Sequence, residues 1–209
     1  MAITKNNLSE RDVALKKIRD EVLTLEDSPL FLYRTENNYL PVIGEGSHIA
    51  KIMLVGEAPG RNEAKSGKPF CGSAGKILDS LLAEAGLKRE EIYITNIVKD
   101  RPQKNRDPLP EEIEMYGPFL DRQIDIIQPR VLVGLGRYSS KYLLGKFGLA
   151  EATLPISELH GRAFEAVAPY GKVTIVPLYH PAAAIYNQRL IETLKKDFKI
   201  LPSLLPPDL

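Results

Sequence analysis

The stretch 51-KIMLVGEAPGRNEAKSGKPFCGSAGK-76 joins an apolar run to a loop rich in glycine and proline. The run predicts a buried strand, and in an open α/β sheet the loop after a strand is where ligands bind. The first side chain of this loop is the carboxylate of Glu57, which would repel a phosphate group. The loop also fails the P-loop and the dinucleotide-binding patterns. These failures remove the two commonest reasons for a glycine-rich loop after a first strand.

Three further apolar runs repeat the pattern of the first. They are 92-IYITNIV-98, 131-VLVGLG-136 and 173-VTIVPL-178. Near-continuous apolar runs are typical of parallel strands that are covered on both faces. Helical patterns separate the runs, over residues 75–91, 110–129, 138–147 and 187–201. The alternation predicts an α/β protein of three layers, α/β/α, with a central four-stranded parallel sheet.

The size and charge of the chain are those of an ordinary globular protein. It has 209 residues, a net charge of +1 and 44% apolar residues. We expect a single domain over 1–209, with an N-terminal helix at about 9–25 and a frayed tail at about 202–209. A neutral total does not require a polyanionic partner, although a local basic face remains possible. No segment has the length of a signal-peptide core or a membrane span, so we expect a cytoplasmic protein. A monomer is the default expectation for its oligomeric state.

Four side chains fall near the carboxyl ends of the predicted strands or in the loops that follow them. Each has an ordinary explanation when it is taken alone. Glu57 could cap a turn, Asn96 could bond to a neighbouring loop, and His180 could be a plain loop histidine. Phe70 alone is more often a core residue than a platform for a ligand. Because all four converge on one edge of a sheet, we interpret them together as a site.

Four motifs then occur in a specific order. They are GEAPG with SGKPFCGSAGKILDSLL, YITNIVKDRPQKNRDPLPEE, PRVLVGLG and PLYHPAAAIYNQRL. Together they closely resemble the family 4-type uracil-DNA glycosylases, from about Gly44 to about Leu194. The resemblance implies the same four-stranded α/β/α fold. It also implies an enzyme that flips deoxyuridine out of single- or double-stranded DNA and hydrolyses the bond to uracil.

The resemblance implies a role for each residue of the site. Glu57 and His180 would be catalytic, the first for the cationic sugar and the water, the second for the charge on uracil O2. The backbone N–H near Ala58 would help His180. Phe70 would stack on the flipped base, Asn96 would read its edge, and Glu63 would shape the pocket.

The resemblance also suggests contacts to DNA. Basic residues in or near the matched loops could form an electropositive rim. They are Lys68, Lys99, Arg101, Lys104, Arg106 and Arg189. The segment Tyr186 to Arg189 is the candidate for wedging the duplex open. His160 matches a histidine–glycine pair of the family, for which a structural turn is the expected role.

The sequence departs from the family at the cofactor. Typical family 4 enzymes hold a four-iron, four-sulfur cluster with four cysteines, and the corresponding positions here are Leu25, Ser28, Asp100 and Gly117. None of them is a thiolate, and the single cysteine, Cys71, cannot replace four. We therefore predict no cluster, no metal and no other cofactor. Packing of the N-terminal helix would have to replace what the cluster holds.

Two alternatives remain open at this point. The chain could bind uracil-containing or damaged DNA without cutting it, which loss of the cluster would suit. It could also be a glycosylase for another deaminated base, such as hypoxanthine. A nucleotide hydrolase is a more distant third, because the phosphate or metal ligands that it needs are missing from the motifs.

Overall fold

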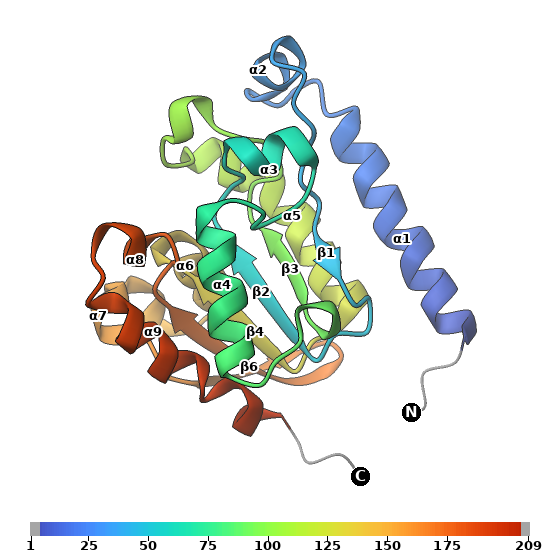
Figure 1. Cartoon of the computed structure of the whole chain (residues 1–209). Coiled ribbons are helices and arrows are strands. Elements are labelled where there is room, and N and C mark those ends of the chain that lie inside the picture. Colours follow the sequence, from blue (N-terminus) through green and yellow to red (C-terminus); the bar gives the residue numbers. More distant parts are fainter. Residues whose placement is uncertain (1–4, 206–209) are drawn as a thin grey trace.

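The structure is a computed structural model that describes residues 5–205, in which a mixed sheet lies between two layers of helices (Figure 1). The sheet has six strands in the order β1-β3-β2-β4-β6-β5. The inner four, β3, β2, β4 and β6, are parallel, whereas the edge strands β1 and β5 run antiparallel to their neighbours. The strands are β1 (Glu45–Gly46), β2 (Ile52–Gly56), β3 (Tyr93–Asn96), β4 (Val131–Leu135), β5 (Phe164–Ala168) and β6 (Gly171–Leu178).

The predicted four-stranded parallel sheet is confirmed as the centre of a larger, mixed sheet. Strand β1 has only two residues and is too short for any sequence pattern. Strand β5 buries only its two end residues and carries the exposed Glu165 and Val167 between them. An edge strand with one solvated face lacks the continuous apolar run that marks a central parallel strand.

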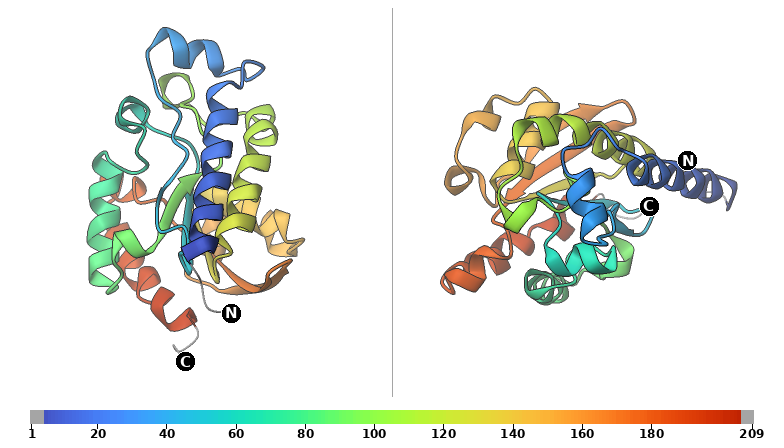
Figure 2. Two further views of the ribbon diagram at one scale, coloured as in Figure 1. Left: turned by 90° about the vertical axis from the view of Figure 1, so that its right-hand side faces the viewer. Right: turned by 90° about the horizontal axis from the view of Figure 1, so that it is seen from above.

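Helices cover both faces of the sheet. In the left view of Figure 2, α4 lies on one side of the strands and α5 on the other, and α1 contacts α5. No helix of the described part of the chain is long and apolar enough to cross a membrane. The helices are α1 (Lys5–Leu23), α2 (Phe31–Glu36), α3 (Arg61–Ser66), α4 (Ser73–Glu84), α5 (Pro110–Ile127), α6 (Arg137–Lys146), α7 (Ile156–Leu159), α8 (Ala183–Tyr186) and α9 (Leu190–Phe198).

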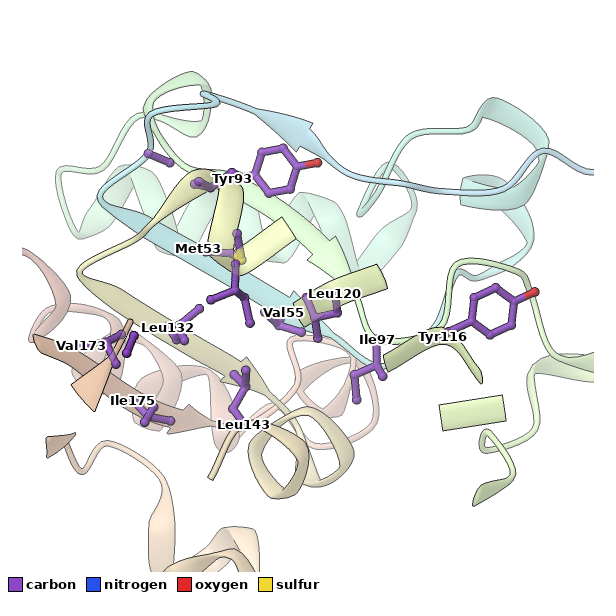
Figure 3. Close-up of a cluster of buried hydrophobic side chains, with 14 of the residues drawn as sticks. Met53, Val55, Tyr93, Ile97, Tyr116, Leu120, Leu132, Leu143, Val173 and Ile175 are labelled. Atoms are coloured by element: carbon purple, nitrogen blue, oxygen red, sulfur yellow. The ribbon is translucent and has the colours of Figure 1, made fainter. Parts of the chain in front are cut away.

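The core consists of two hydrophobic clusters, one on each face of the sheet. Along β2, Met53 and Val55 join the cluster beneath α5 and α6, part of which Figure 3 shows. Ile52 and Leu54 join the opposite cluster beneath α4 and α9. Successive side chains of a strand point to opposite faces. A strand covered on both sides therefore needs an apolar residue at every position, which explains the unbroken run at residues 52–55.

The two ends of the chain differ from the prediction. The N-terminal helix α1 runs from Lys5 to Leu23 rather than over 9–25. The predicted helix over 187–201 is present but shorter, as α9 over Leu190–Phe198, and the sequence analysis did not predict the short helix α8 that precedes it. The predicted frayed tail begins too early, because residues 201–204 form a 3₁₀ helix whose Leu201 is fully buried. Residues 206–209 lie outside the described part of the chain.

A buried polar network holds the N-terminal segment against the sheet. One guanidinium nitrogen of Arg34, on α2, lies 3.1 Å from a carboxylate oxygen of Asp100 and also donates to the carbonyl of Val22 at 2.9 Å. Tyr116, on α5, donates to Asp100 at 2.6 Å, and its hydroxyl lies 2.7 Å from that of Ser28. The network thereby joins the end of α1, the α2 region, the segment after β3 and α5.

We predict that Arg34→Met lowers the free energy of unfolding by about 3 kcal/mol, since it leaves Asp100 buried without its cation. Urea denaturation measures the change. Arg19→Met is the control, because Arg19 forms an exposed pair with Asp20 and should cost less than about 1 kcal/mol. Equal losses in the two variants would contradict the importance of the Arg34–Asp100 pair.

Candidate active site

A cavity of about 490 Å³ opens at the carboxyl ends of β2, β3 and β6, which lie toward the top of Figure 1. Ligands of open α/β sheets bind at this edge. All six residues that were predicted for catalysis or base binding line the cavity. They are Glu57, Ala58, Glu63, Phe70, Asn96 and His180, and the exposed Tyr186 of α8 lies at the same cavity.

The cavity requires a glycine at the end of β2. Gly56 pairs with Asn96 in the parallel ladder. A methyl group at Gly56 would lie 2.3 Å from the side-chain oxygen of Asn96 and 2.9 Å from the ring of Phe70. Both distances are shorter than real contacts allow. The close approach of these two side chains to the strand is therefore possible only without a side chain at position 56.

Glu63, on α3, fixes the loop that carries Phe70. One of its carboxylate oxygens accepts hydrogen bonds from the backbone N–H groups of Cys71, at 3.0 Å, and Gly72, at 2.8 Å. Phe70 itself has a φ of 48°, which is uncommon for a bulky residue. We infer that the Glu63 carboxylate stabilises this backbone conformation, so that it supports the cavity wall from behind.

Phe70 and His180 form one wall of the cavity. Their rings are stacked, with centroids 5.5 Å apart and planes inclined by 26°. Phe70 comes from the loop before α4, and His180 follows β6. Only 6% of Phe70 is exposed, so most of its side chain packs against the protein and only a small part faces the cavity.

The hydrogen bonding of His180 defines its tautomer. Its Nδ1 atom accepts a hydrogen bond from the backbone N–H of Ala182 at 3.1 Å. Burial lowers the pKa of His180 to about 4, so the ring is neutral at physiological pH. A neutral imidazole whose Nδ1 is an acceptor carries its proton on Nε2. His180 is therefore a neutral hydrogen-bond donor through Nε2.

Glu57 titrates near neutrality. Burial, the largest cause, and the charge of Asp107 raise its pKa, the charge of Arg137 lowers it, and the net pKa is about 7. Sequence analysis missed both of these neighbours. Asp107 accepts hydrogen bonds from Arg137 and, at 3.1 Å, from the hydroxyl of Tyr138. Arg137 is the first residue of α6, directly after β4, so its position at a strand end was the available signal.

Asn96 presents an unused amide to the cavity. The residue is only 2% exposed, and within the described residues its side chain forms no hydrogen bond to the protein. A buried amide normally finds hydrogen-bond partners. The donor and acceptor of Asn96 are therefore available to a ligand.

Two of the six basic residues predicted for the electropositive rim are buried, which argues against their contact with DNA. Lys99 is completely buried, and its ammonium group bonds to Thr95, the carbonyl of Asn96 and Gln123. Arg101 is 8% exposed, and its guanidinium group bonds to Tyr33 and Asn105. The charge of these residues predicted exposure, and no sequence pattern beside them indicated that they turn inward. Lys68, Tyr186 and Arg189 are exposed and stay predictions.

The positions predicted to replace the cluster cysteines do not form a metal site. Ser28 and Asp100 belong to the buried network, and Leu25 packs beside the core. Tyr116 belongs to the same network, and its neighbour Gly117 faces Tyr142 on α6. Their donor atoms are neutral hydroxyls and one carboxylate that is paired with Arg34, which do not suit an iron–sulfur cluster. No other metal-binding cluster occurs in the described residues.

Comparison with known proteins reveals extensive similarity. The sequence profile of the uracil DNA glycosylase superfamily matches residues 43–201. The type-4 uracil-DNA glycosylase of Sulfurisphaera tokodaii is 45% identical over 192 residues, which are 91% of this chain and 84% of that protein. The type-4 uracil-DNA glycosylase of Archaeoglobus fulgidus is 45% identical over 173 residues, 83% of this chain and 85% of that protein.

We predict that Gly56→Ala lowers the free energy of unfolding by about 1–3 kcal/mol, because the added methyl group overlaps Asn96 and Phe70. Thermal unfolding monitored by circular dichroism measures the loss. Gly145→Ala in α6 is the control, since the added methyl group there meets nothing within 4 Å. It should be neutral or stabilising, as alanine in a helix interior generally is. A neutral Gly56→Ala would contradict the packing argument.

The raised pKa of Glu57 predicts a pH-dependent effect of Glu57→Gln on stability. Because the folded-state pKa of about 7 exceeds the ordinary value of 4.5, the charged form is disfavoured in the folded protein. The penalty is absent below about pH 4 and complete above about pH 8. Glu57→Gln should thus raise the melting temperature at pH 8 relative to the wild type and much less at pH 5. A difference independent of pH would show that Glu57 is not desolvated.

Proposed function

The chain belongs to the uracil-DNA glycosylase superfamily, and we propose that it removes uracil from DNA by hydrolysing the N-glycosidic bond of a flipped-out deoxyuridine. The product would be free uracil and an abasic site, the first step of base excision repair. One observation carries the proposal: Glu57, Phe70, Asn96 and His180 line a single cavity at the ligand-binding edge of the sheet. The type-4 relatives, named as uracil-DNA glycosylases, support the same reaction.

Recognition of uracil falls to Asn96 and Phe70. Uracil offers an N–H donor at N3 and an acceptor at O4, and one asparagine amide matches both. The free amide of Asn96 supports this role. Phe70, whose ring is stacked on that of His180, would supply the apolar wall for the pyrimidine ring. Glu63 contributes indirectly, since it holds the loop from which Phe70 extends.

Departure of uracil leaves negative charge on the base, mostly on its oxygens. The Nε2–H of neutral His180 would donate to uracil O2, as would the backbone N–H near Ala58. Fixed donors aimed at developing charge are among the largest contributions to catalysis. A neutral histidine suits this role because its proton stays on the enzyme while the hydrogen bond strengthens.

The sugar becomes positively charged as its bond to uracil breaks. A carboxylate at Glu57 would stabilise that cation and orient the water that attacks C1′. With a pKa of about 7, Glu57 is partly ionised at neutral pH, and only the ionised form serves in this way. The rate of uracil release should therefore rise with pH through neutrality.

The outer surface would bind the DNA backbone. Lys68 and Arg189 are exposed near the cavity and could contact phosphates, while Tyr186, 89% exposed, could fill the gap left by the flipped base. Flipping one nucleotide requires no second subunit, so we propose a monomer that acts as one domain.

We also propose that the enzyme works without an iron–sulfur cluster. The chain has one cysteine, and the described residues contain no group that could bind a metal. The Arg34–Asp100 network links the same segments by hydrogen bonds. Metal analysis of purified protein, alongside an assay after incubation with an iron chelator, tests this: stoichiometric iron or loss of activity would overturn it.

The proposed function predicts cleavage of an end-labelled duplex with one deoxyuridine opposite guanine, after alkaline treatment of the abasic product. Wild-type protein should cleave this duplex but not a matched thymine duplex. Glu57→Gln and His180→Ala should each slow single-turnover excision by about 100-fold or more, because each removes an interaction made in the transition state. Both variants should remain folded by circular dichroism.

The controls separate the alternative functions. Glu165→Gln changes an exposed carboxylate on the far edge strand β5 and should cleave like the wild type. Failure of folded wild type on uracil but activity on hypoxanthine would assign another base. Binding of uracil-containing DNA without cleavage of either substrate would support a non-catalytic binder instead.

A further inference from the structure

Lys99 is a buried lysine that the proposed reaction does not use, and burial lowers its pKa to about 7. Its side chain is fully buried, and among the described residues no carboxylate pairs with it. Its Nζ atom instead lies 2.9 Å from Oγ1 of Thr95 and 2.6 Å from both the carbonyl of Asn96 and Oε1 of Gln123. A lysine is almost never fully buried without a specific partner, so these contacts need a reason.

The three contacts match an ammonium group. The Thr95 hydroxyl donates its proton to the carbonyl of Ile43 at 2.6 Å, so it accepts from Lys99. The amide nitrogen of Gln123 donates to the same carbonyl at 2.9 Å, which turns its oxygen toward Lys99. The carbonyl of Asn96 can only accept. Three acceptors therefore face the three N–H donors of one ammonium group.

The turn that Lys99 closes also belongs to the candidate active site. The N–H groups of Ile97 and Val98 donate to the carbonyls of Gly56 and Glu57, each at 3.0 Å. The turn from Asn96 to Lys99 is thus tied to the strand end that carries Glu57. Lys99 closes the turn from the other face of the sheet, where Gln123 on α5 anchors its ammonium group.

We propose that Lys99 is a positioning residue for base recognition, which holds the backbone of Asn96 so that its amide meets the edge of uracil. The inference rests on the proposed function. The Asn96 amide has no hydrogen bond in the protein, within the residues described, so its placement depends on its own backbone. The ammonium group bonds to that backbone directly.

Lys99→Met tests the proposal, because methionine keeps the unbranched length and removes the three donors. Uracil excision in a single turnover should slow by roughly 10- to 100-fold, as expected for loss of hydrogen bonds from a charged donor. Free uracil should also inhibit the variant at least several-fold more weakly. Binding to a duplex with a tetrahydrofuran abasic site, which has no base, should stay within about twofold of the wild type. Lys88→Met, at an exposed lysine before β3, is the matched control.

A double-mutant cycle with Asn96→Ala distinguishes positioning from general loosening. If Lys99 acts through Asn96, then Lys99→Met should change excision little in the Asn96→Ala background. Full additivity of the two effects would overturn the proposal, as would unchanged inhibition by free uracil. Weaker binding to the abasic duplex would instead make Lys99 a contributor to DNA binding, and that too would overturn it.

Two further outcomes are informative. If the folded wild-type protein does not release uracil, both the proposed function and the role of Lys99 are refuted. If the wild type is active and Lys99→Met is unaffected, only the role of Lys99 is refuted. Should Lys99→Met not fold, Gln123→Met replaces it, since it removes the α5 anchor and leaves the cavity residues intact. It should then weaken inhibition by free uracil, and an unchanged inhibition would overturn the proposal.

Discussion

The parallel pairing of β2 with β3 fixes the relative positions of the groups around the cavity. In this register Gly56, the last residue of β2, lies opposite Asn96, the last residue of β3. Glu57 follows Gly56 directly in the chain. The turn after Asn96 continues the pairing by two more hydrogen bonds to the same strand end. The carboxylate and the amide are consequently placed by backbone hydrogen bonds rather than by flexible loops. Phe70 and His180 then approach this fixed pair from two other segments.

Desolvation gives the two titratable groups of the cavity different protonation states. Burial lowers the pKa of His180 to about 4 and raises that of Glu57 to about 7. Both shifts favour the neutral form of the group. The neutral form suits His180, which acts as a hydrogen-bond donor, but it does not suit Glu57, which would act as a charged carboxylate. Of the two charged neighbours of Glu57, Asp107 adds to the effect of burial on its pKa, and Arg137 opposes it more weakly.

The sequence predicted the elements of the fold whose burial requires apolar residues at every position. Strands covered on both faces need apolar residues at every position, and the ends of those strands indicated Glu57, Asn96 and His180. Edge strand β5 was not predicted, because its residues 165 and 167 are exposed to solvent and Glu165 interrupts the apolar run. Lys99 and Arg101 were assigned to the surface by their charge, although each has one hydrogen-bond partner far away in the chain, Gln123 for Lys99 and Tyr33 for Arg101. Partners of that kind become visible only in three dimensions.

Lys99 and Asp100 are neighbours of opposite charge, yet they do not pair with each other. Lys99 turns toward Gln123 on α5, and Asp100 turns toward Arg34 and Tyr116. The far end of the same loop is held by Glu112, which bonds to Arg106 and to the N–H of Leu109. The loop that contributes Asp107 to the cavity is therefore fastened at both ends to α5. The position of this loop depends on hydrogen bonds and ion pairs that need defined geometry and that reach α5 or Arg34. These interactions explain why so many polar side chains are buried along the loop.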